Sequence, residues 1–124
     1  MSESDPLTYE IIGAAIDVSK ELGNGLVESV YQTCLVFSLR ARQLRVVRHP
    51  TMPVVFDGQL MNQAFKPDLI VEESVIVEVK AVSAILPVHQ AQILNYMRLG
   101  KFSKGLLINF HAYPFKSGIK RFVF

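Results

Sequence analysis

The sequence has one cysteine, only a small excess of positive charge and no long apolar run, and each shortage excludes a class of protein. Cys34 is the one cysteine in 124 residues, so no internal disulfide can form, and its apolar helical surroundings predict a buried thiol. No apolar run reaches the ~18 residues that a membrane span needs. Residues 1–6 lack the basic and apolar segments of a signal peptide. We therefore expect a cytoplasmic protein with no membrane partner.

Familiar catalytic motifs are absent as well. The chain has no Walker A loop, no G-x-S-x-G nucleophile motif and no zinc-type spacing of cysteine and histidine. The net charge of +2 permits a nucleic-acid partner but does not argue strongly for one. Since 50% of the residues are hydrophobic, a core can form, and the length fits one domain over residues 1–124, with residues 1–6 expected to be flexible.

Hydrophobic periodicity and turn residues predict an α/β fold. Helices are expected at about 6–22, 26–42 and 87–100, and strands at 45–48, 52–56, 67–71, 75–81, 105–110 and 119–124. Asp57-Gly58 predicts a hairpin turn, after which residues 59–65 form a returning strand or an irregular arm. The helix before residue 104 allows a parallel crossover, so we expect a mixed sheet with helices packed on it.

Two charged residues interrupt one of the apolar strands. Glu78 and Lys80 stand in the run 75–81, and because side chains alternate across a strand, both point to the same face. For an E-x-K motif alone, a Glu–Lys pair on a solvated surface is the simplest interpretation, since burying an unpaired charge is costly. Other residues favour a functional site.

The first of these is Asp68, ten residues before Glu78. A three-residue turn over 72–74 would pair Val71 with Val75 and Asp68 with Glu78 across an antiparallel hairpin. Any odd-length turn keeps the two carboxylates on one face, whereas an even-length turn separates them. The turn contains no glycine, and the sequence leaves both registers open.

If the carboxylates are paired, they repel each other unless a cation lies between them. Mg²⁺ suits this position because it takes a few carboxylate oxygens and keeps several waters. Lys80, one step further along the same face as Glu78, can hold a water or a phosphate oxygen. The combination is suited to hydrolysis of a phosphodiester.

The helix predicted after Pro87 carries polar residues on one face. At ~100° per residue, His89, Gln92 and Tyr96 fall close together, and polar groups in an apolar stripe need partners. We expect Gln92 to hydrogen-bond a metal-bound water or a phosphate, and Tyr96 to orient it. His89 is equally well explained as a partly exposed residue near the helix start.

Glu28 is in the first turn of the second predicted helix. The helix dipole favours a carboxylate there, by ~0.3–1 kcal/mol, which explains the residue without any function. Glu28 also shares a face with Tyr31, which should pack inward, so its carboxylate could be a third acidic metal ligand. The sequence leaves both interpretations open.

Together these residues resemble a known family. Pro67-Asp68 followed by Glu78-Val79-Lys80 resembles the PD-(D/E)XK signature of the restriction-endonuclease-like nucleases. The segment 25–31, with Gly25, Glu28 and Tyr31, is similar to the motif that names the GxxExxY family within that superfamily. Ser19 and Asn24 depart from the family pattern, outside the proposed metal site. The resemblance extends from about residue 7 to residue 123.

The resemblance implies a restriction-endonuclease-like αβββαβ core with an extra N-terminal helix. It implies a Mg²⁺ site, with Mn²⁺ as a substitute, formed by Glu28, Asp68 and Glu78 with the Val79 carbonyl. Lys80 and Gln92 would act in catalysis, and Tyr31, His89 and Tyr96 would support the site. The expected substrate is DNA, with RNA less favoured.

Two other functions stay open. One is a non-catalytic nucleic-acid-binding or regulatory module on the same fold, since fold does not settle function. The other is an interaction protein acting as a homodimer, for which Leu94 and Met97 on the outer side of the third helix would form an apolar surface.

Overall fold

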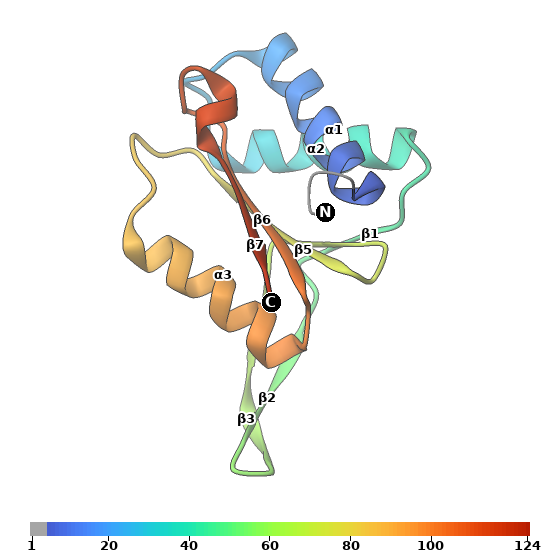
Figure 1. The fold of residues 1–124 in the computed structure, drawn as a ribbon, viewed down its shortest axis with the longest axis vertical. Helices are drawn as coiled ribbons and strands as arrows, with labels where there is room; N and C mark the ends of the chain where they lie inside the picture. The colour runs from blue at the N-terminus through green and yellow to red at the C-terminus, as the bar shows by residue number, and fades with distance from the viewer. Residues whose placement is uncertain (1–4) are drawn as a thin grey trace.

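The computed structural model describes residues 5–124, and a mixed sheet with helices on both faces forms the main body of the fold (Figure 1). The elements are α1 (Pro6–Leu22), α2 (Glu28–Ala41), β1 (Val46–Arg48), β2 (Met52–Phe56), β3 (Gln59–Phe65), β4 (Leu69–Val71), β5 (Val75–Lys80), α3 (Pro87–Gly100), β6 (Lys104–Asn109), the 3₁₀ helix η2 (Phe115–Gly118) and β7 (Ile119–Val123). The α/β fold class is confirmed. Residues 1–4, where we expected a flexible end, lie outside the described part.

The helix boundaries follow from local chemistry. Asp5 caps α1, because its carboxylate accepts the Leu7 N–H at 3.1 Å. Pro6 suits the first helical position, because proline has no backbone N–H that would need an acceptor there. Gly23 and Gly25 have φ of +70° and +100°, conformations that only glycine adopts without strain, and they end α1 before α2 begins at Glu28. The start of α2 is two residues later than the predicted residue 26. In residues 5–124, we find no helix with the length and apolar character of a membrane span.

The sheet confirms the predicted parallel crossover. Its strand order is β1-β4-β5-β6-β7, and β5 and β6 are parallel while the other neighbours are antiparallel. The connection from β5 to β6 runs through α3, as a crossover between parallel strands requires. β5 is therefore the middle strand, with neighbours on both sides, and both of its faces are covered.

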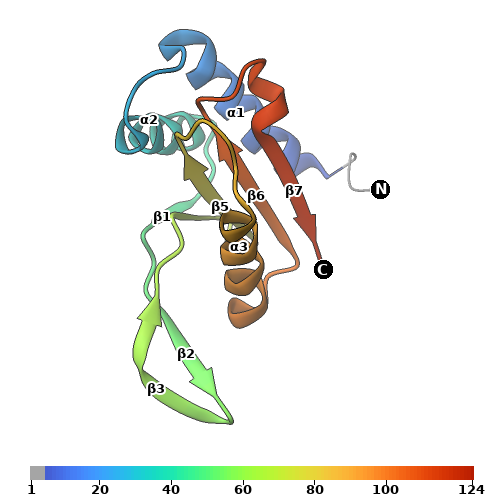
Figure 2. The same cartoon turned by 90° about the vertical axis from the view of Figure 1, so that its left-hand side faces the viewer.

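Alternate residues of β5 belong to two separate cores. Val77 and Val79 pack against α1 and α2, whereas Ile76 packs with Ile93 and Met97 of α3 on the opposite face. Figures 1 and 2 show α1 and α2 beside one face of the strands and α3 beside the other. Because side chains alternate, Glu78 and Lys80 share the face of Ile76, which is the α3 face.

One prediction about α3 is wrong. Met97 was expected on the outer side of the helix, but its side chain is fully buried between α3 and the sheet. The reason is the close contact with β6: a Cβ added at Gly105 would lie 2.6 Å from Met97 Sδ, so the missing side chain at Gly105 makes room for Met97. The predicted apolar surface on α3 therefore loses one of its two members.

The β2–β3 hairpin forms a separate two-stranded sheet that projects from the body as an arm (Figure 2). Asp57 and Gly58 both have positive φ, at 53° and 74°, which is the turn chemistry the sequence predicted. Residues 59–65 are thus a returning strand and not an irregular segment. The base of the arm is fixed by Met52, which packs on the α3-side core, and by Phe65, which stacks on Tyr96.

Candidate active site

Asp68 and Glu78 meet where the β4–β5 hairpin opens. The register pairs Val71 with Val75 and Leu69 with Val77, so the odd-length turn over 72–74 is confirmed. One step further, the Asp68 N–H donates to Glu78 Oε2 at 2.7 Å and the Val79 N–H donates to Asp68 Oδ2 at 2.8 Å. Each carboxylate thus holds the backbone of the opposite strand, and the two carboxyl groups are adjacent.

Burial dominates the electrostatics of this pair. Glu78 is 3% exposed, and burial, followed by the charge of Asp68, raises its pKa from 4.5 to about 8. Burial also raises the pKa of Asp68, although the Val79 N–H and the Lys80 charge oppose the shift. Without a cation, the two groups therefore hold a proton at neutral pH that ordinary carboxyls would release. A cation between them would favour the ionised form of both.

Lys80 supplies one positive charge at the end of β5. Its side chain is half-buried on the face of Glu78, and its charge lowers the proton affinity of Glu28, Asp68 and Glu78 alike. The strand is held at this point because the Phe110 N–H donates to the Lys80 carbonyl at 2.8 Å. Lys80 therefore places one positive charge that acts on all three acidic residues.

Glu28 comes to the site from the first turn of α2. Its half-buried carboxyl has a raised pKa, mainly because of burial, and the charges of Lys80 and Asp68 also act on it. Glu28 therefore lies near enough to Asp68 and Lys80 for their charges to act on its carboxyl. Among residues 5–124, however, no three histidine, cysteine or acidic side chains converge closely enough to form a ready-made metal centre. The metal set of Glu28, Asp68, Glu78 and the Val79 carbonyl stays a prediction.

The oxygens present suit a hard divalent cation better than any other group. Asp68 and Glu78 offer carboxylate oxygens, the ligand type that Mg²⁺ and Mn²⁺ prefer. One oxygen of each is fixed by a backbone N–H, so the pair is oriented before any ion arrives. The donor set therefore fits the divalent cation predicted from the sequence.

The polar face of α3 lines the same site. Gln92 Nε2 donates to Tyr96 Oη at 3.0 Å, as expected for neighbouring groups on one face. Burial, followed by the charges of Glu78 and Asp68, raises the pKa of Tyr96, so its hydroxyl is close to the carboxylate pair. His89 has a structural task, because its Nδ1 accepts the Leu86 N–H at 3.0 Å and caps α3.

Tyr31 acts on the backbone that leads into α2. Its hydroxyl donates to the Gly23 carbonyl at 2.7 Å and accepts the Leu26 N–H at 3.1 Å. The ring is fully buried and stacks on Phe110 at 4.7 Å between centroids. Tyr31 therefore fixes the turn that positions Glu28, three residues earlier in the helix.

Two residues beside the site were not identified from the sequence. Gln32 is 4% exposed and lies close enough to Asp68 to lower the pKa of that carboxyl. Arg48 Nε in turn donates to Gln32 Oε1 at 2.7 Å. A signal for Gln32 was present, because it lies four residues after Glu28 and so on the same helix face. Arg48 had no such signal, since only the fold brings β1 to α2.

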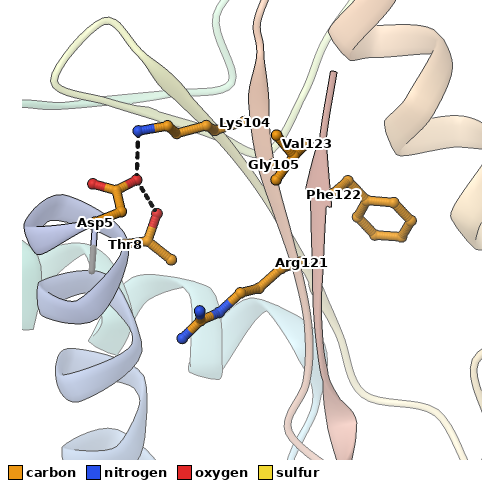
Figure 3. Close-up of a pocket in the computed structure, with 7 residues that line it drawn as sticks. All are labelled: Asp5, Thr8, Lys104, Gly105, Arg121, Phe122 and Val123. Atoms are coloured by element: carbon orange, nitrogen blue, oxygen red, sulfur yellow. Dashed lines mark hydrogen bonds and ion pairs between the residues drawn. The ribbon is translucent and has the colours of Figure 1, made fainter. Parts of the chain in front are cut away.

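A separate cavity lies on another part of the molecule (Figure 3). It has a volume of about 310 Å³ and is lined by Asp5, Thr8, Lys104, Gly105, Arg121, Phe122 and Val123. Asp5 accepts hydrogen bonds from Thr8 Oγ1 at 2.8 Å and pairs with Lys104 at 2.6 Å. None of the residues predicted for the active site lines this cavity, so it is not part of the candidate site.

Comparisons with known proteins agree with the geometry. The model of one family, the PD-(D/E)XK nuclease superfamily, matches residues 5–122, which is nearly the whole chain. No curated protein and no solved structure gives a significant match. The matched range contains Pro67-Asp68 and Glu78-Val79-Lys80, the residues in which the sequence resembles the PD-(D/E)XK signature. The chain therefore belongs to the PD-(D/E)XK nuclease superfamily.

Proposed function

We propose that this protein is a Mg²⁺-dependent nuclease that hydrolyses phosphodiester bonds of DNA, with RNA as the less favoured substrate. The observation that carries the proposal is the pair of buried Glu78 and half-buried Asp68, each fixed by a backbone hydrogen bond beside Lys80. Membership of the nuclease superfamily supports a nucleic-acid substrate. The finer assignment to the GxxExxY family rests on Gly25, Glu28 and Tyr31.

The residues of the chain would divide the reaction between them. Asp68 and Glu78, with Glu28 and the Val79 carbonyl, would hold the cation, which when bound lowers the pKa of a water and neutralises phosphate charge. The Lys80 ammonium would orient the attacking water and stabilise the charge that develops on the phosphate. Gln92 would contact a phosphate oxygen or water, and Tyr96 would keep the Gln92 amide in place through the 3.0 Å hydrogen bond.

The test combines metal binding with cleavage. Mg²⁺ and Mn²⁺ are titrated by calorimetry into the wild type, Asp68→Ala, Lys80→Ala and Glu21→Ala, and each protein is then incubated with single- and double-stranded DNA and with RNA. Glu21→Ala is the control, because it removes an exposed carboxylate from α1, outside the candidate site. We expect Asp68→Ala to lose both metal binding and cleavage.

Lys80→Ala separates the two functions. We expect it to keep metal binding but to lose cleavage by ~10²-fold or more, the usual effect of removing one electrostatic stabiliser of the transition state. If wild-type activity survives unchanged in both Asp68→Ala and Lys80→Ala, the assignment is wrong.

A binding or regulatory module is the second candidate. The net charge of +2 permits such a module but does not argue strongly for nucleic-acid binding. Nucleic-acid affinity without cleavage, in both Mg²⁺ and Mn²⁺, would select this function. A homodimer would suit cleavage of both strands of a duplex, and light scattering tests for one.

A further inference from the structure

Asn109, the last residue of β6, has a buried side-chain amide with three hydrogen bonds. It is 3% exposed, and its Oδ1 accepts the Val82 N–H at 3.0 Å and the His111 N–H at 3.2 Å. Its Nδ2 donates to the Val82 carbonyl at 2.9 Å. Backbone N–H groups only donate, so the two that face Oδ1 determine which way the amide points. Since an unpaired buried amide is costly, these bonds fix the side chain in one orientation.

The amide extends the contact between β5 and β6 past the end of β5. Lys80 and Asn109 form the last register pair of the two parallel strands. The Phe110 N–H donates to the Lys80 carbonyl at 2.8 Å, and two residues later both backbone groups of Val82 bond to the Asn109 amide. The backbone from Lys80 to Val82 is therefore attached to β6 at both ends, although the strand itself stops at Lys80.

The surroundings of this contact show why the amide matters for the loop. Ser83 and Ala84, which follow Val82, are exposed and belong to no helix or strand, and such segments open easily. Asn109 is supported on its other side by Gly118, where an added Cβ would lie 3.3 Å from Asn109 Cβ and 2.6 Å from its carbonyl oxygen. A closely packed residue thus holds the start of a loosely packed loop.

The position of this backbone matters for the Lys80 ammonium. Its four-carbon stem is flexible, so the backbone from which it starts determines where the ammonium can reach. The Lys80 charge acts on Asp68 and Glu78 and is therefore close to the candidate site. A displacement of about 1 Å in a catalytic group can slow a reaction by ~10²-fold.

We propose that Asn109 is a positioning residue, which holds residues 80–82 against β6 and thereby places the Lys80 ammonium for cleavage. This inference rests on the nuclease function proposed above. None of the three hydrogen bonds of the amide goes to Asp68 or Glu78. Asn109 therefore acts on cleavage through Lys80, and metal binding does not depend on it.

A double-mutant cycle tests whether Asn109 acts through Lys80. Asn109→Ala, Lys80→Ala and the double variant are compared with the wild type in single-turnover cleavage at saturating Mg²⁺, and Mg²⁺ affinity is measured by calorimetry. Asn95→Ala is the matched control, because it removes an exposed amide of α3 that accepts from Arg98 at 2.9 Å. Thermal unfolding shows whether each variant is folded at the assay temperature.

We expect Asn109→Ala to cleave ~10–100-fold more slowly than the wild type, and the double variant to cleave within about twofold of Lys80→Ala. The Mg²⁺ affinity of Asn109→Ala, and both the affinity and the rate of Asn95→Ala, should stay within about twofold of the wild type. Partial unfolding would instead slow cleavage by the same factor with and without Lys80. Should Asn109→Ala fail to fold, Asn109→Asp replaces it in the same cycle, because it keeps an acceptor for the Val82 N–H but lacks the amide donor.

The outcomes separate this inference from the proposed function. If the wild type cleaves and the Asn109 variant cleaves equally fast, or loses the same factor with and without Lys80, the positioning role is wrong and the nuclease proposal is untouched. If the wild type cleaves no nucleic acid in Mg²⁺ or Mn²⁺, the proposed function fails, and the positioning role fails with it.

Discussion

The raised pKa of Glu78 predicts that the metal-free protein loses stability as the pH rises. In the unfolded chain Glu78 releases its proton near pH 4.5, whereas in the folded protein it does so near pH 8. Between these values the folded state binds the extra proton, so the free energy of unfolding falls as the pH rises. This contribution is complete below about pH 4.5 and is lost as the pH passes through about 8.

The magnitude follows from one proton. Each pH unit between the two pKa values costs about 1.4 kcal/mol, so the loss from about pH 5 to pH 7.5 is on the order of 3 kcal/mol. Glu78→Gln keeps an oxygen to accept the Asp68 N–H but cannot ionise, so this part of the pH dependence should vanish. Asp68, whose pKa is also raised, contributes pH dependence to both proteins.

Urea unfolding in EDTA at several pH values measures the difference. The chain has no tryptophan, so far-ultraviolet circular dichroism is the suitable signal. The free energy of unfolding of Glu78→Gln minus that of the wild type should increase by roughly 3 kcal/mol from pH 5 to pH 7.5. Parallel pH profiles for the two proteins would refute the reasoning, because they would mean that Glu78 titrates alike in both states.

Two further predictions concern positions outside the site. Gly105→Ala should destabilise the protein by ~1–3 kcal/mol in urea unfolding, because the new methyl would lie 2.6 Å from buried Met97 Sδ; an unchanged transition midpoint would contradict the packing. Asp5→Ala should cost ~1 kcal/mol through loss of the α1 cap, and Asp5→Asn should cost less because its amide oxygen can still accept the Leu7 N–H. Both Asp5 variants should bind Mg²⁺ as the wild type does, and a change in affinity would count against the separation of α1 from the site.

The adjacency of Asp68 and Glu78 could be predicted from the sequence, because a short hairpin allows only a few strand registers. Once residues 72–74 were taken as the turn, alternation along the strands placed both carboxylates on one face. Glu72 and Glu73 have φ of 52° and 55°, left-handed conformations that favour glycine. Because both residues are glutamate, the sequence did not indicate that the turn adopts these conformations. The choice between odd and even turns therefore had to come from the structure.

Other parts of the site depend on tertiary packing. The helical wheel of α3 placed Gln92 beside Tyr96, but it misplaced Met97 because it cannot show which side of the helix meets the sheet. Arg48 lies sixteen residues from Gln32, on a three-residue strand whose neighbour in the sheet is known only after folding. Contacts of this kind leave no periodic signal in a sequence.

The β2–β3 arm has a consequence for the timescale of motion near the site. A two-stranded sheet is at best marginally stable alone, and the side chains of Val55, Phe56 and Leu60 gain little from burial. Its backbone amides should therefore exchange with solvent through local opening, well below the free energy of global unfolding that protects β5. Because Phe65 at the base of the arm stacks on Tyr96 at 5.1 Å, each such opening also releases one side of the Tyr96 ring. Local opening of the β2–β3 arm therefore frees one side of Tyr96, whose hydroxyl lies close to the Asp68–Glu78 pair.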